Sequence, residues 1–243
     1  MSQPDAYNPF ADVYHRHWGN FADQILPIIE ASVLQRLPPG SPILDLCCGT
    51  GGLAKKLTED GWDVTGVDGS ASMLEIARRE APRARFQQAD AQDFHYESCF
   101  AAVFSTYDSL NHILEWNGVR KTFSNVRRAL TPGGWFFFDL NMRKGYQNRW
   151  KGQFHIVKDD HAVMVSSRYD DERRIAFMDF TLFTREQDHW HRSDFTLTQR
   201  CYEEEQVIGA LREAGFSDIE VHDTSRFDWN QIGRSIFIAR SHP

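Results

Sequence analysis

The chain has 243 residues, of which 41% are hydrophobic and 25% charged, so it has the composition of a globular protein with one large domain or one domain carrying an insertion. Its 27 basic and 34 acidic residues give a formal net charge of −7 at pH 7, which argues against a nucleic-acid binder. No apolar stretch approaches the roughly 20 residues that span a bilayer and no leader is visible, so we expect no membrane contact and a cytoplasmic location. The four cysteines form no C-x-x-C pair, which favours reduced thiols and predicts no metal site.

The N-terminal segment, residues 7–37, is predicted to be helical. Phe21, Ile25 and Ile29 recur at the spacing that places them on one apolar stripe. Proline inside such a pattern removes a backbone donor, so we expect the helix to kink or restart at Pro27.

Short apolar strands and helices then alternate up to residue 140. Strands are expected at 42–46, 62–67, 85–87, 100–104 and 135–140, with helices starting near 53, after the capping Ser70, and along the stripe that runs from 119 to 130. This alternation predicts an α/β fold with a doubly wound, Rossmann-like parallel sheet and right-handed crossovers.

The pattern changes after residue 140. Between 151 and 199 apolar residues alternate with period two, which predicts an inserted antiparallel β-sheet after the fifth strand. A helix beginning at 203–205 and strands at 216–221 and 235–239 follow. We therefore expect one domain made of residues 1–140 and 200–243, with an N-terminal helical cap, and a lid over the substrate side made of residues 141–199.

The first strand ends in Asp45-Leu46-Cys47-Cys48-Gly49-Thr50-Gly51, at the edge where open parallel sheets bind ligands. Gly49 and Gly51 let the backbone approach a ligand and direct amides at it, although a tight turn or a dinucleotide loop would read similarly. The carboxylate of Asp45 would repel a pyrophosphate but suits an ammonium or a sulfonium. S-Adenosylmethionine carries both and no phosphate, so it is the expected cofactor.

The residues at three further strand ends are also those expected to bind S-adenosylmethionine. Asp68 follows Gly51 by 17 residues and can accept two hydrogen bonds from a ribose diol, a position that also fits NAD. Asp90 follows the third strand and can accept from an adenine amino group. Residues 105–112, after the fourth strand, form a polar cluster at the point where the winding order of the sheet reverses.

In order and spacing, Asp45-x-x-Cys48-Gly49-Thr50-Gly51, Gly66-Val67-Asp68-x-Ser70-x-x-Met73-Leu74, Asp90-Ala91 and Pro132-Gly133-Gly134 resemble the motifs of class I S-adenosylmethionine-dependent methyltransferases. Many members have glycine where this chain has Cys47. The resemblance implies a seven-stranded sheet whose last strand is antiparallel. It also implies cofactor contacts at the matched residues, which we expect at Asp45, Cys48, Gly49, Thr50, Gly51, Asp68, Ser70, Met73, Asp90 and Ala91. From their places at the strand ends we add Gly69, Gln92, Thr106, Asp108 and Ser109 to the expected cofactor contacts.

A narrower resemblance is carried by Phe10-Ala11-x-x-Tyr14, by a histidine after the fourth strand, by the insertion and by Cys201-Tyr202-x-x-Glu205-Gln206. These features are similar to those of N-methyltransferases that dimethylate nucleotide-linked amino sugars, and the resemblance implies that Tyr14 and His112 line the methyl-acceptor site.

The expected function is therefore methyl transfer to an amine or hydroxyl of a small molecule. His112 is the first candidate for the base or for a group that orients the acceptor, and Tyr14 is the second. An NAD(P)-dependent oxidoreductase and a non-catalytic cofactor-binding protein are the alternatives. The sequence leaves open the acceptor, the attacking atom and the oligomeric state, monomer or homodimer.

Overall fold

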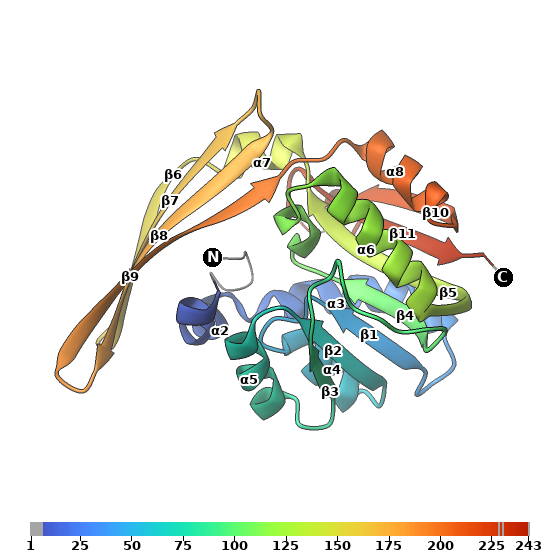
Figure 1. Cartoon of the computed structure of the whole chain (residues 1–243), viewed down its shortest axis with the longest axis horizontal. Coiled ribbons are helices and arrows are strands. Elements are labelled where there is room, and N and C mark those ends of the chain that lie inside the picture. The colour runs from blue at the N-terminus through green and yellow to red at the C-terminus, as the bar shows by residue number, and fades with distance from the viewer. Residues whose placement is uncertain (1–6, 228, 230, 243) are drawn as a thin grey trace.

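A seven-stranded sheet with helices on both faces forms the body of the molecule in the computed structural model, which describes residues 7–227, 229 and 231–242 (Figure 1). Its strand order is β10-β11-β5-β4-β1-β2-β3. The strands are β1 (Pro42–Leu46), β2 (Asp63–Asp68), β3 (Arg85–Gln88), β4 (Phe100–Ser105), β5 (Leu130–Asn141), β10 (Phe216–Asp223) and β11 (Arg234–Ser241). The first five run parallel, whereas β11 is antiparallel to both β5 and β10. The predicted fold class is confirmed.

Helices cover the two faces of this sheet because β1, β4 and β5 are apolar on both sides. The covering helices are α3 (Phe21–Ser32), α4 (Gly52–Glu59), α5 (Ala71–Glu80), α6 (Trp116–Ala129) and α8 (Glu204–Glu213). One buried cluster includes Phe123 of α6 and Phe136 and Phe138 of β5. On the opposite face, Phe137 belongs to a second cluster together with Leu57 of α4.

The N-terminal segment forms η1 (Asn8–Phe10), α2 (Ala11–Trp18), α3 (Phe21–Ser32) and η2 (Leu34–Arg36). Pro27 lies inside α3, so of the two expected outcomes the helix does not restart at this residue, and a kink there stays a prediction. The helix continues because its stripe, which includes Ile25 and Ile29, is fully buried and offsets the missing backbone donor. The helical conformation is instead interrupted at residues 19–20, between α2 and α3.

The inserted segment contains α7 (Arg143–Arg149) and a four-stranded antiparallel sheet made of β6 (Gly152–Val157), β7 (His161–Asp170), β8 (Ile175–Glu186) and β9 (His189–Arg200). Figure 1 shows this curved sheet arching beside α2, with the β8–β9 hairpin extending past it. Val163, Phe180 and Leu197 pack against Phe10 and Val13. This packing brings the N-terminal helices and the inserted sheet together at one edge of the main sheet.

The described ranges contain neither a membrane-spanning helix nor a metal-binding cluster. No helix there is both long and apolar enough to cross a membrane. In the same residues, no three His, Cys, Asp or Glu side chains gather in a way that could hold a metal ion.

Candidate functional site

A cavity of about 460 Å³ opens at the carboxyl ends of β1, β2, β3 and β4. Of the residues expected to contact a cofactor, it is lined by Gly49, Asp68, Gly69, Met73, Asp90, Ala91, Gln92 and Ser109. We call it the cofactor cavity. A narrow recess beside it is lined by Asp45, Cys48, Thr50 and Thr106, and also by Gly49 and Ser109. The structure therefore gathers residues from the ends of four strands around one space.

Asp68 ties the loop after β1 to the loop after β2. Its carboxylate accepts hydrogen bonds from the backbone amides of Gly49 and Ser70, both at 2.9 Å. Burial raises the pKa of Asp68, while these amide bonds favour its ionised form. The carboxylate thus faces the cofactor cavity from a fixed position, as a group that binds a ribose diol must.

Ser70 and Gly51 line neither the cofactor cavity nor the recess, and both instead stabilise the loops around them. The Ser70 hydroxyl accepts from the Met73 amide at 3.2 Å, which confirms it as the cap of α5. Gly51 has φ +79°, and a Cβ atom there would lie 3.0 Å from Ala77 of α5 rather than in ligand space. Its small size is required for packing between α4 and α5.

Asp45 is a buried carboxylate with no cationic partner among the residues that the structure describes. It is 2% exposed, and its Oδ2 atom makes no hydrogen bond to any described residue. Burial, with a smaller contribution from Asp68, raises the pKa of Asp45 to about 7. An unsatisfied carboxylate at this depth is costly unless a cation or donor reaches it, so the recess fits the ammonium group of S-adenosylmethionine.

The far end of the cofactor cavity suits an adenine ring. The Asp90 Oδ1 atom accepts from the backbone amide of Gln92 at 2.8 Å and from its side-chain amide at 3.1 Å, which fixes the carboxylate. Ala91 leaves room for a planar ring beside it. Cys47 also lines the cavity, with φ +61°, a conformation that glycine adopts without strain, and this explains why glycine is common there in methyltransferases.

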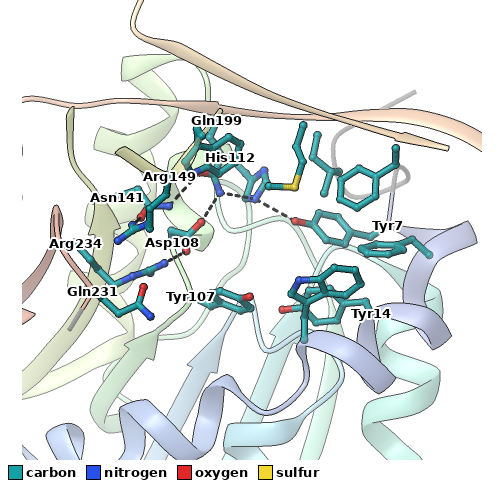
Figure 2. Close-up of a pocket in the computed structure, with 16 residues that line it drawn as sticks. Tyr7, Tyr14, Tyr107, Asp108, His112, Asn141, Arg149, Gln199, Gln231 and Arg234 are labelled. Atoms are coloured by element: carbon teal, nitrogen blue, oxygen red, sulfur yellow. Dashed lines mark hydrogen bonds and ion pairs between the residues drawn. The ribbon is translucent and has the colours of Figure 1, made fainter. Parts of the chain in front are cut away.

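A second space of about 250 Å³ lies between the N-terminal helices, the edge of the main sheet and the inserted sheet (Figure 2). We call it the acceptor chamber. Its lining residues include the aromatic side chains of Phe10, Trp18 and Phe180 and a polar end formed by Asp108, Asn141, Arg149, Gln199 and Arg234. Four side chains line both the chamber and the cofactor cavity: Tyr7, Tyr14, Tyr107 and His112. The two spaces are therefore adjacent, and these four side chains form a shared wall between them.

His112 is held in one protonation state by its neighbours. It ends the turn η3 (Ser109–His112) after β4, and its Nδ1 atom donates to the Thr198 carbonyl at 3.1 Å. The Nε2 atom is therefore the acceptor, at 3.1 Å from the Tyr7 hydroxyl and 3.0 Å from the Gln199 amide nitrogen. Burial lowers the pKa of His112, so the imidazole is neutral at pH 7 and has a lone pair directed at the shared wall.

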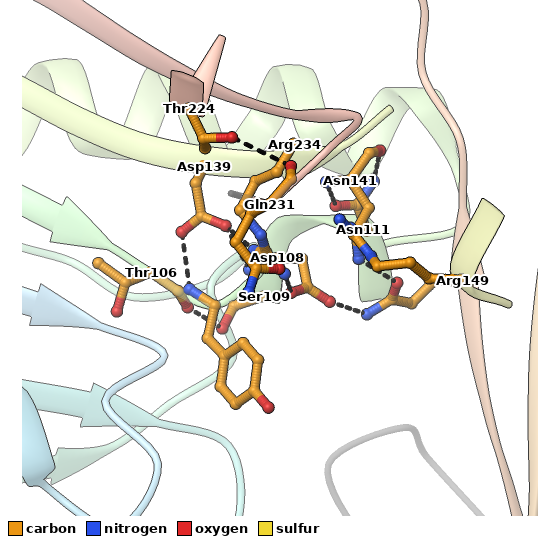
Figure 3. A network of polar contacts seen from close by, with 12 residues as sticks. Thr106, Asp108, Ser109, Asn111, Asp139, Asn141, Arg149, Thr224, Gln231 and Arg234 are labelled. Atoms are coloured by element: carbon orange, nitrogen blue, oxygen red, sulfur yellow. Dashed lines mark hydrogen bonds and ion pairs between the residues drawn. The ribbon is translucent and has the colours of Figure 1, made fainter. Parts of the chain in front are cut away.

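A buried ionic network supports the end of β4 (Figure 3). The Asp139 carboxylate accepts from the amides of Tyr107 at 2.7 Å and Asp108 at 3.0 Å, residues with φ +63° and +49°. Arg234 pairs with Asp139 and, at 2.5 Å, with Asp108. These bonds hold two consecutive left-handed residues that would otherwise be strained. Asp108 consequently lies in the acceptor chamber rather than in the cofactor cavity expected for it.

Sequence reasoning missed Tyr7, Tyr107, Asp139, Gln199 and Arg234. Asp139 carried a usable signal, because an acid inside the apolar strand at residues 135–140 must find a partner when it is buried. Tyr14 was predicted, and it lines the chamber, the cavity and the recess. Burial raises the pKa of Tyr14 well above its usual value, so its hydroxyl is neutral at pH 7.

Comparison with known proteins agrees with this geometry. A family model described as a methyltransferase domain matches residues 43–134. YqeM of Bacillus subtilis (strain 168), named as a methyltransferase, is 30% identical over 216 residues, which cover 86% of each chain. The dTDP-3-amino-3,4,6-trideoxy-alpha-D-glucopyranose N,N-dimethyltransferase of Streptomyces venezuelae is 32% identical over 102 residues, 42% of this chain and 43% of that one.

The crystal structure of an S-adenosylmethionine-dependent methyltransferase from Clostridium acetobutylicum ATCC 824 has the same fold. It superposes with a TM-score of 0.78 at 24% identity, covering 98% of this chain and 99% of that one. The family model and the relatives named above are described as methyltransferases, which disfavours the nicotinamide alternative. The chain therefore belongs to the S-adenosylmethionine-dependent methyltransferases.

Proposed function

We propose that this enzyme methylates an amine nitrogen of a small molecule that binds in the acceptor chamber. The observation that carries the proposal is the shared wall, where Tyr7, Tyr14, Tyr107 and His112 face both spaces. The amino-sugar N,N-dimethyltransferase among the relatives acts on an acceptor of this kind, which supports an amine.

The residues that would hold S-adenosylmethionine follow from the donors and acceptors around the cofactor cavity. Asp45 would pair with the ammonium group, Asp68 would accept from the ribose hydroxyls and Asp90 from the adenine amino group. When bound, the cofactor supplies a methyl group on a positively charged sulfur, which is already activated for transfer. The protein then gains most by orienting the acceptor, an effect that can supply about 7–11 kcal/mol.

His112 would receive the proton that the acceptor amine loses. Its Nε2 lone pair is available at pH 7 once the amine replaces both donors that now contact it, the Tyr7 hydroxyl and the Gln199 amide. An imidazole with a lowered pKa is a weak base, which suits an amine better than an alcohol. Tyr14 would orient the acceptor from the same wall. Residues 141–199 and the N-terminal helices would cover the site and exclude water.

The test is methyl transfer from S-adenosylmethionine to a panel of primary amines and the matching alcohols, with S-adenosylhomocysteine as the measured product. We expect amines to react, and His112→Ala to lower turnover about 10²–10⁴-fold while cofactor affinity measured by calorimetry changes little. His112→Asn keeps a hydrogen bond but cannot take a proton, so it separates orientation from proton transfer. Reaction with alcohols alone, or near-normal turnover by the Ala variant, would contradict the proposal.

A further inference from the structure

The polar end of the acceptor chamber contains two arginines in different situations (Figure 2). Arg234 forms ion pairs with Asp108 and Asp139. Arg149, the last residue of α7, has no carboxylate within 4 Å among the described residues. Its two hydrogen bonds to them, both 2.6 Å long, go to the uncharged Ile232 carbonyl and the Asn141 side-chain oxygen.

These two bonds leave part of the Arg149 guanidinium for a ligand. A guanidinium has five N–H donors in a planar fork, and two parallel donors match a carboxylate or a phosphate. The Arg149 side chain as a whole is exposed to solvent, while burial of part of it and the nearby Arg234 lower its pKa. An anion placed beside Arg149 would favour the charged form of the guanidinium.

The charge balance of the chamber specifies the ligand further. Asp108 lines the chamber, and Asp139 pairs with Arg234 without lining it; together these two carboxylates balance the two guanidinium groups, Arg149 and Arg234, so the polar end and its buried partner are neutral as a whole. A ligand that carries only an anionic group would give the polar end a net negative charge. A ligand that carries both an ammonium and an anion preserves neutrality, with its anion at Arg149 and its nitrogen toward His112 on the shared wall.

We infer that the methyl acceptor is an amine that also carries an anionic group, a carboxylate or a phosphate, and that Arg149 binds this group. The inference rests on the proposed function, because it assigns the acceptor to the chamber. It makes Arg149 a specificity-determining residue rather than a catalytic one.

The test uses two matched pairs of amines and two simple anions. Phenylalanine differs from phenethylamine by a carboxylate, and 2-aminoethyl phosphate differs from 2-aminoethanol by a phosphate. Acetate and inorganic phosphate probe the anion site without an amine. Affinities for protein saturated with S-adenosylhomocysteine are measured by calorimetry, and turnover with the four amines is measured with S-adenosylmethionine.

Variants on the same helix provide the controls. Arg149→Gln removes the charge but keeps a side-chain donor for the Ile232 carbonyl, and Arg149→Lys keeps the charge. Arg143→Gln removes a charge from the opposite end of α7, where Arg143 pairs with Asp171 outside the chamber. Melting temperatures show whether each variant is folded.

The wild-type protein should bind the anionic member of at least one pair about 10- to 100-fold more tightly than the uncharged member, the ratio expected of hydrogen bonds to a charged group. Arg149→Gln should remove this preference, Arg149→Lys should keep part of it and Arg143→Gln should keep all of it. The pair that shows the preference distinguishes a carboxylate from a phosphate.

Equal affinity within both pairs, a preference that survives Arg149→Gln, or no Arg149-dependent binding of any of the six probes would overturn the inference. If the uncharged amines are methylated without any Arg149 dependence, the inference fails while the proposed function stands. If the anionic amines bind through Arg149 but no amine is methylated, the proposed function fails.

Discussion

The unsatisfied carboxylate of Asp45 predicts how cofactor affinity depends on pH. Only the ionised form can pair with the ammonium of the ligand, and burial places the pKa of Asp45 at about 7 in the ligand-free protein. Binding should therefore weaken as the pH falls below 7, because the carboxylate must first lose a proton. The α-amino group of the ligand, with an ordinary pKa near 8, stays charged over this range.

The size of the effect follows from the ionised fraction. With a pKa of about 7, roughly half of the Asp45 side chains are ionised at pH 7, about one in eleven at pH 6 and about one in a hundred at pH 5. Affinity for S-adenosylhomocysteine should thus fall about fivefold from pH 7 to pH 6 and about fiftyfold from pH 7 to pH 5. At pH 7 binding should release about half a proton.

Calorimetric titration between pH 5 and pH 7, in buffers with different ionisation enthalpies, measures both the affinity and the released protons. Asp45→Asn should bind weakly with little pH dependence and release no proton. Asp68→Asn should keep the dependence on pH, although its overall affinity is lower. If the pH dependence of the wild-type protein persists in Asp45→Asn, then Asp68 or another group titrates and the reasoning about Asp45 is refuted.

Three further outcomes are expected. Asp68→Ala should weaken binding of S-adenosylmethionine by about 1.5–3 kcal/mol in calorimetry, the scale of hydrogen bonds to a charged group, and an unchanged affinity would remove Asp68 from the site. Gly51→Ala should lower the melting temperature more than Gly61→Ala: both positions have a positive φ, but only the first adds a close contact, with α5. Equal losses would mean that this contact is tolerated. Tyr7→Phe should raise the pKa of His112, followed by NMR, because the lost hydroxyl donates to the neutral imidazole; a fall would show that it stabilises the charged form.

The strands of the main sheet could be predicted because each buried strand is a short apolar run that ends at glycine or a polar residue. The start of β5 could not, since Pro132 and Gly133 read as a turn, yet Leu130 already pairs with Phe100 of β4. Helix α7 was missed because its seven residues show no apolar stripe, and its buried Tyr146 faces the inserted sheet. A local sequence pattern does not predict an element whose formation depends on tertiary contacts.

Some residues of the candidate site could likewise be predicted from the sequence, and others could not. The residues around the cofactor cavity follow strands whose order is readable from sequence, so most of them could be named in advance. The polar end of the acceptor chamber depends on contacts between distant segments. Gln199 meets His112 across 87 positions, and Arg234 meets Asp139 across 95. One sequence contains no pattern that pairs such residues, and the role of every residue named for the site remains a prediction for the experiments above.

The separate origins of the two spaces have a consequence for protein engineering. Among the residues that the structure describes, none from 141–199 lines the cofactor cavity, whereas Met178, Phe180, Leu197 and Gln199 of the inserted sheet line the acceptor chamber. Exchanging this sheet between related chains should therefore redirect the enzyme to new acceptors while its affinity for S-adenosylmethionine is preserved. Natural variation in the same segment would diversify substrates without the loss of cofactor binding that usually accompanies changes near an active site.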